Sequence, residues 1–78
     1  MNIPKEIILY PHGKRDHKLY FGVNNKYIGI AEMDIDGFYS FYPEENSRGW
    51  SSYGLGLIKE TLDVLNEEWN NHIKENLK

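Results

Sequence analysis

The sequence predicts an α+β fold, an antiparallel β-meander of three to four strands with one C-terminal α-helix packed on one face. Aromatic-rich segments with two-residue alternation fill the chain up to Trp50, and turn residues separate them. From Ser52 onward, apolar residues recur every three to four positions, as in an amphipathic helix. The chain has 78 residues and no cysteine, so we expect a single domain, 1–78, without disulfides or thiolate zinc sites.

The strands are predicted at about 6–10, 18–23, 26–33 and 38–42, where β-branched and aromatic residues concentrate. Asn24-Asn25 is typical of a two-residue hairpin turn, because asparagine tolerates positive φ. This turn would pair Phe21 with Ile28 and Leu19 with Ile30. The segment 34–37 has the composition of a second turn.

The helix is predicted at about 52–76, with Ser51 or Ser52 as its N-cap. One stripe of the helix collects apolar side chains: Leu55, Ile58, Leu62, Leu65, Trp69 and Ile73. A helix of this length spans about 38 Å, whereas six-residue strands reach only about 20 Å. We therefore expect Trp69 and Ile73 to lie beyond the sheet, where a partner could contact them.

The predicted hairpin register divides the strands between two faces. Facing the helix we expect Leu19, Phe21, Ile28, Ile30, Tyr39 and Phe41. The opposite face would carry Tyr20, Tyr27, Ala31, Met33, Phe38 and Tyr42. Because one helix covers only one face, an aromatic surface stays uncovered. The predicted binding surface comprises Tyr20, Tyr27, Met33, Phe38, Tyr42, Trp69 and Ile73.

The net charge is only −3, but it is unevenly distributed. Residues 1–31 hold five Lys and Arg against two acids, and residues 32–78 hold four against ten. The basic loop contains His12, Lys14, Arg15, His17 and Lys18. Beside exposed aromatics, this loop resembles surfaces that bind single-stranded nucleic acid. Three or four neutralised phosphates would give weak, salt-sensitive binding, and a nucleic acid is therefore not the partner we expect.

Motifs for catalysis or metal binding are incomplete. The segment 32–37 resembles the start of a calcium loop, but Pro43 stands where the bidentate glutamate belongs. The glycine spacing at 49–54 lacks the lysine and hydroxyl residue of a phosphate loop. We expect no metal, no cofactor and no enzymatic activity. The N-terminus lacks the features of a secretion signal, so we expect a cytoplasmic protein without membrane association.

A broader pattern covers residues 27 to 69. It comprises Tyr27-Ile28-Gly29, then Asp36-Gly37-Phe38-Tyr39 with Phe41 and Pro43, then Trp50, Leu65-Asn66 and Trp69. This pattern resembles small uncharacterised proteins encoded by tailed bacteriophages. The resemblance implies an accessory protein that binds a host or defence protein in the host cytoplasm, and it supplies no catalytic residues.

Together these features predict a small non-enzymatic protein-binding module whose partner the sequence does not identify. A homodimer is the simplest way to bury the uncovered aromatic face. A weak single-stranded nucleic-acid binder and a structural homo-oligomer are the alternative hypotheses.

Overall fold

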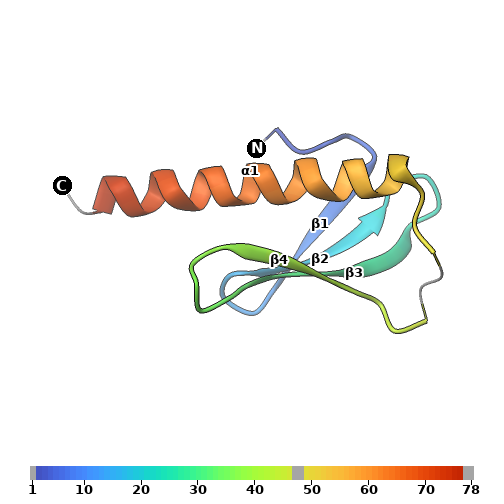
Figure 1. Cartoon of the computed structure of the whole chain (residues 1–78), viewed down its shortest axis with the longest axis horizontal. Coiled ribbons are helices and arrows are strands. Elements are labelled where there is room, and N and C mark those ends of the chain that lie inside the picture. Colours follow the sequence, from blue (N-terminus) through green and yellow to red (C-terminus); the bar gives the residue numbers. More distant parts are fainter. Residues whose placement is uncertain (1, 47–48, 77–78) are drawn as a thin grey trace.

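A computed structural model describes residues 2–46 and 49–76 of the chain. Within these residues, the strands form one four-stranded antiparallel sheet in the order β1-β2-β3-β4. The strands are β1 (Ile7–His12), β2 (Asp16–Phe21), β3 (Lys26–Met33) and β4 (Tyr39–Pro43), and the helix α1 spans Ser52–Asn76. Figure 1 shows α1 lying across one face of this sheet. The predicted α+β meander with a packed C-terminal helix is confirmed.

The helix begins where the sequence indicated, at a serine cap. The Oγ of Ser51 accepts a hydrogen bond from the Gly54 N–H at 3.1 Å, which satisfies one of the first unpaired amides of the helix. Gly54 is buried, and a Cβ there would lie 3.7 Å from the Trp50 ring and 3.9 Å from Phe21. The glycine thus lets the first turn approach the sheet closely. No helix within the described residues is long and apolar enough to cross a membrane.

The core lies between α1 and the facing side of the sheet. Its buried apolar members are Ile7, Leu19, Ile28, Ala31, Tyr39, Leu57, Ile58 and Leu65. Packed against them are Leu9, Phe21, Met33, Phe41, Trp50, Leu62 and Trp69. The predicted contact through Ile58 and Leu65 is confirmed, and Leu62 is partly buried. The prediction for Leu55 is wrong: it is 52% exposed, because Gly54, one position earlier, faces the sheet and turns Leu57 inward.

The predicted register between β2 and β3 is also wrong. Phe21 pairs with Lys26, and Lys18 pairs with Ile30. The loop between the strands therefore contains four residues, 22–25, and its exposed tip includes Val23. Asn25 does adopt a positive φ of 53°, as expected of asparagine in a turn.

A β-bulge accounts for the remaining error in β3. Leu19 pairs with Gly29, but the next residue of β2, Tyr20, pairs with Tyr27. The extra residue moves every later side chain of β3 to the other face of the sheet. Ala31, which is fully buried, and Met33 consequently face the helix, whereas Ile30 faces away from it.

The other strand ends differ from prediction by one or two residues. The first hairpin turn occupies only residues 13–15, so β1 continues through Pro11 to His12, and β2 begins at Asp16. In the turn before β4, the Gly37 N–H donates to the Asp34 carbonyl and the Asp34 N–H donates to the Phe38 carbonyl, each at 3.0 Å. Met33 pairs with Tyr39, so this turn has an odd number of residues and keeps Tyr39 and Phe41 on the same face as Met33 and Ala31, which is the helix side predicted for them.

Candidate functional site

The face of the sheet opposite α1 is the largest candidate site, and we call it the open face. Leu19 is fully buried on the helix side, so its neighbours Lys18 and Tyr20 point away from the helix. The same alternation on each strand, with the bulge included, gives the full set of side chains. The open face comprises Ile8, Tyr10, His12, Asp16, Lys18, Tyr20, Tyr27, Ile30, Glu32, Ser40 and Tyr42.

Tyrosine rings cross the open face in a row. The ring of Tyr10 meets that of Tyr20 edge-on, with centroids 5.1 Å apart, and Tyr20 lies 5.3 Å from Tyr27. Tyr10 remains 47% exposed and Tyr42 46% exposed. Such rings give large contact area with few rotatable bonds, and protein interfaces favour them for this reason.

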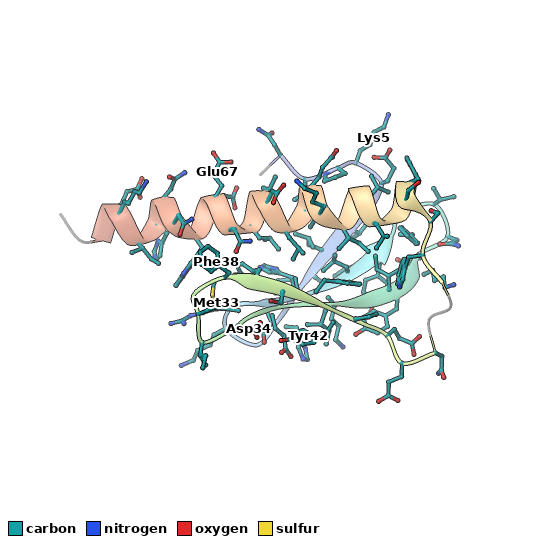
Figure 2. The ribbon with its side chains drawn as sticks, viewed as in Figure 1. Lys5, Met33, Asp34, Phe38, Tyr42 and Glu67 are labelled. Atoms are coloured by element: carbon teal, nitrogen blue, oxygen red, sulfur yellow. The ribbon has the colours of Figure 1, made fainter. Side chains whose placement is uncertain are left out.

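Asp34 holds the ring of Tyr42 on β4, at the edge of the open face. The Tyr42 hydroxyl donates to the Asp34 carboxylate, with its two oxygens at 2.8 and 3.0 Å. Figure 2 shows both residues on the side of the sheet away from α1. This hydrogen bond raises the pKa of Tyr42, and burial raises the pKa of Tyr27. Both phenols therefore stay neutral at physiological pH, and the Tyr42 proton is already donated to Asp34.

The edge of the sheet at β1 offers few groups for pairing with another strand. The Gly22 N–H donates to the Glu6 carbonyl at 2.9 Å, so Glu6 directs its backbone groups toward β2. Every second residue of an antiparallel strand does the same, and the residues between them direct their amides outward, away from the sheet. The outward positions are Ile7, Leu9 and Pro11. The Ile7 N–H already donates to the Pro4 carbonyl at 3.0 Å, and proline has no N–H. Only Leu9 keeps an outward amide.

The edge at β4 is closed in the same way. The Asp34 N–H donates to the Phe38 carbonyl, so Phe38 and every second residue after it direct their backbone groups toward β3. The outward positions are therefore Tyr39, Phe41 and Pro43. The Tyr39 N–H donates to Oδ1 of Asn66 on the helix at 2.7 Å, and Pro43 has no N–H. One outward amide, that of Phe41, remains. Addition of a further strand needs a row of free groups, so the open face is more accessible to a protein than either edge.

A second candidate is a groove of about 290 Å³ between the β1–β2 turn and the distal helix. The Tyr39 hydroxyl donates to the Arg15 carbonyl at 2.8 Å, and the Arg15 guanidinium lies 4.9 Å above the Trp69 ring. The groove lining consists of Lys14, Arg15, His17, Tyr39, Leu65, Glu68, Trp69 and His72. Burial lowers the pKa of His17, against the opposing charges of Asp16 and Glu68. At neutral pH His17 therefore adds no charge to the groove.

The structure divides the predicted binding surface. Tyr20, Tyr27 and Tyr42 meet on the open face, but Met33 packs against the core because of the bulge. Phe38 is 53% exposed and precedes β4; Figure 2 places it at the turn end of the sheet, away from Tyr42.

The two predicted residues of the distal helix lie on the helix side of the sheet. The prediction that Trp69 lies beyond the sheet is wrong: Trp69 packs against the core and lies under Arg15. Ile73, one turn later, is 36% exposed. Figure 1 shows that the end of α1 extends past the sheet, as helix length predicted.

The predicted basic loop is divided as well. Lys14, Arg15 and His17 line the groove beside the helix, whereas Lys18 lies on the open face. His12, exposed at the end of β1, has an open-face position as well. The basic residues and the tyrosines therefore do not form one continuous surface.

Sequence reasoning missed Ile8, Tyr10 and Ile30 on the open face. The alternation of side chains in 7–10 contained the signal for the first two. For Ile30 the signal was Gly29, since a glycine inside a strand pattern often marks a bulge.

Among the described residues, no group of three or more His, Cys, Asp or Glu side chains is arranged to hold a metal ion. Comparison of the chain with protein-family models, curated proteins and solved structures finds no match.

Proposed function

We propose that the chain is a small non-enzymatic protein-binding module and that the open face is its docking surface. The observation that supports this most directly is the row of tyrosines across β1, β2 and β3, continued by Tyr42 on β4. Exposed aromatic rings beside charged residues are typical of interface surfaces, in which aromatic anchors are enriched. The closed edges β1 and β4 make a face-on mode more favourable than strand addition.

The kind of target follows from the phage resemblance, which favours a host or defence protein. The open face suits a protein better than a nucleic acid, because Lys18 and His12 are its basic residues, while Asp16, Glu32 and the Asp34 carboxylate beside Tyr42 are acidic. A phosphate backbone would meet repulsion along β3 and β4.

Site-specific photocrosslinking tests the proposal. A benzophenone amino acid replaces Ser40 on the open face, and in a matched control it replaces Leu55, which is exposed on the helix. Both proteins are expressed in the cells in which the chain naturally occurs. We expect a specific protein adduct from position 40 and none from position 55. An equal adduct pattern from the two positions would exclude the open face as the docking surface.

Direct binding to the crosslinked protein then separates the hypotheses. Tyr10→Thr and Tyr42→Thr keep the strand preference but remove the two most exposed rings of the open face, and each should weaken binding at least about tenfold. Affinity should persist when salt rises to about 0.5 M, since an apolar interface is little screened. Binding to a single-stranded oligonucleotide that collapses over the same salt range would instead support the nucleic-acid hypothesis.

A further inference from the structure

A cavity of about 370 Å³ lies beside the start of α1, and Figure 1 shows the chain turning away from the sheet there after β4. The last residue of β4, Pro43, pairs with Gly29, and the Glu44 N–H donates to the Ile28 carbonyl at 3.0 Å. Because β3 begins two residues earlier, at Lys26, its first residues have no partner in β4. The cavity occupies this notch, and its volume is typical of small-molecule sites, which hold about 300 to 1,000 Å³.

Two aromatic rings form the apolar wall of the cavity. Phe21 and Trp50 line it, and both side chains pack against the core. The Trp50 ring meets Phe21 edge-on with centroids 6.2 Å apart and meets Phe41 edge-on at 5.9 Å, so its orientation is fixed from two sides. A wall that is already ordered binds an apolar group without the entropic cost of arranging its side chains.

Opposite charges lie at the two sides of the cavity, whose lining includes Lys26 and Glu44. Lys26 pairs with Phe21 across β2 and β3, so its side chain lies on the helix side of the sheet. Glu44 follows Tyr42 by two positions and therefore lies toward the open face. There burial raises the pKa of Tyr27, and the charge of Glu44 adds to this effect. The cavity thus has a cation at one side and an anion at the other.

The close approach of α1 at Gly54 still leaves space for one methyl group. A Cβ at this position would lie 3.5 Å from Oγ of Ser51, 3.7 Å from the Trp50 ring and 3.9 Å from Phe21, which are ordinary contact distances. Alanine is the better helix former, so stability alone would favour it here. The three contacted residues all line the cavity, and glycine keeps the space among them open. A residue that enlarges a cavity at some cost in stability is expected of a binding site.

We propose that this cavity binds a free α-amino acid with an aromatic or large aliphatic side chain. Lys26 pairs with the carboxylate, Glu44 pairs with the ammonium, and the ligand side chain packs against Phe21 and Trp50. The two charged groups of an amino acid, with a hydrogen bond of about 2.8 Å at each end, bridge about 8 to 9 Å. A sphere of 370 Å³ is about 9 Å across, so such a ligand reaches from one charge to the other.

Titration with L-phenylalanine, followed by ¹H–¹⁵N NMR spectroscopy, tests the proposal. We expect a dissociation constant in the millimolar range, as is usual for a ligand of about a dozen non-hydrogen atoms. The Trp50 indole and Gly54 amide signals should shift, and the Gly13 signal in the β1–β2 turn should not. Two analogues test the charges: 3-phenylpropionate lacks the ammonium and phenethylamine lacks the carboxylate. Each should bind at least about tenfold more weakly than L-phenylalanine.

Variants of the lining assign each end of the ligand. Lys26→Gln should weaken L-phenylalanine binding about tenfold and leave phenethylamine binding unchanged, whereas Glu44→Gln should weaken L-phenylalanine binding and leave 3-phenylpropionate binding unchanged. Gly54→Ala should remain folded and lose binding. Its matched control is Gly56→Ala, whose added Cβ meets no atom within 4 Å and which should bind like the wild type. Circular dichroism verifies folding, and if Gly54→Ala does not fold, the two charge variants decide.

Four outcomes would overturn the proposal. The first is the absence of shifts at Trp50 and Gly54 up to about 20 mM L-phenylalanine. The second is equal affinity for the three compounds, which would show that only the ring is bound. The third is a folded Gly54→Ala protein that binds as tightly as the wild type, and the fourth is unchanged L-phenylalanine binding in both charge variants. None of these results concerns the open face, whose own test is the photocrosslink from position 40.

Discussion

Replacing Gly29 by alanine should destabilise the protein more than its small size suggests. Gly29 has a φ of +153°, which L-residues rarely adopt, and it lies in the bulge that sets the register of β2 and β3. An added Cβ would lie 2.4 Å from the Tyr42 carbonyl oxygen and 2.7 Å from the Phe41 ring. Real carbon atoms do not approach this closely, so β4 must move or the bulge must be lost.

Two costs combine in this variant. A non-glycine residue in such a backbone conformation costs about 1 to 3 kcal/mol, and forcing extra atoms into packed structure costs about 1 to 3 kcal/mol more. We expect a loss of about 2 to 6 kcal/mol from a total stability of about 4 to 12 kcal/mol for a chain of this length. The variant should be marginally folded or unfolded at room temperature.

Urea denaturation followed by tryptophan fluorescence measures the loss, with Gly56→Ala as the matched control. Gly56 is exposed in the helix with no atom near its would-be Cβ, so alanine there should add about 0.5 to 1 kcal/mol. The same change is therefore expected to have opposite signs at the two positions. A loss below about 1 kcal/mol for Gly29→Ala would refute the reasoning, because neither the close contacts nor the backbone conformation would then be required.

Four further predictions concern the core, the β4 edge, the pH dependence and the second turn. Leu65→Ala should cost about 2 to 5 kcal/mol in urea denaturation, whereas Leu55→Ala should change stability by less than about 0.5 kcal/mol; equal losses would contradict the assigned helix phase. Asn66→Ala removes the acceptor of the Tyr39 N–H and should cost about 1 kcal/mol, and an unchanged midpoint would show that water replaces it without penalty. Burial lowers the pKa of His17, so the unfolded chain binds its proton more readily; stability should fall as pH drops below about 6.5, and His17→Gln should reduce that slope. Thermal melts with excess calcium or with a chelator should coincide, since the Asp34 and Asp36 carboxylates already accept hydrogen bonds from Tyr42 and the Phe38 amide; a calcium-dependent rise of several degrees would indicate a metal site.

Local signals predicted most of the fold. Turn residues and the change from two-residue to three- or four-residue spacing located the strands and the helix, because each signal acts over a few neighbouring positions. The serine cap at position 51 and the existence of a turn before Tyr39 belong to this class. Such features depend on backbone chemistry that a short stretch of sequence contains.

The register of the second hairpin could not be predicted in the same way. Asn24-Asn25 suits a two-residue turn, but the observed four-residue loop uses the positive φ of Asn25 equally well. The choice depends on packing: the bulge brings Ala31 under the helix, where it is fully buried, and directs the larger Ile30 to the open face. A comparison of both registers against the helix would have been needed to decide this.

The groove beside the helix was missed for a related reason. The sequence predicts Arg15 in a basic loop and Trp69 beyond the sheet, with no contact between them. The contact between them arises because the first turn bends toward α1, where the Tyr39 hydroxyl binds the Arg15 carbonyl. Residues so distant in sequence meet only through the assembled sheet.

A purely structural role for the tyrosines is the main competing explanation of the open face. Tyrosine favours strands, and cross-strand aromatic pairs such as Tyr20 with Tyr27 stabilise a sheet without any partner. That explanation accounts for Tyr20 and Tyr27, whose rings cover each other, better than for Tyr10 and Tyr42, which remain nearly half exposed on the two edge strands. The two roles separate in the threonine variants. If the rings serve only the sheet, Tyr10→Thr and Tyr42→Thr should lower stability and leave association unchanged. If they serve docking, association should weaken at least about tenfold while stability changes by less than about 1 kcal/mol, because threonine keeps the strand preference and little buried area is lost.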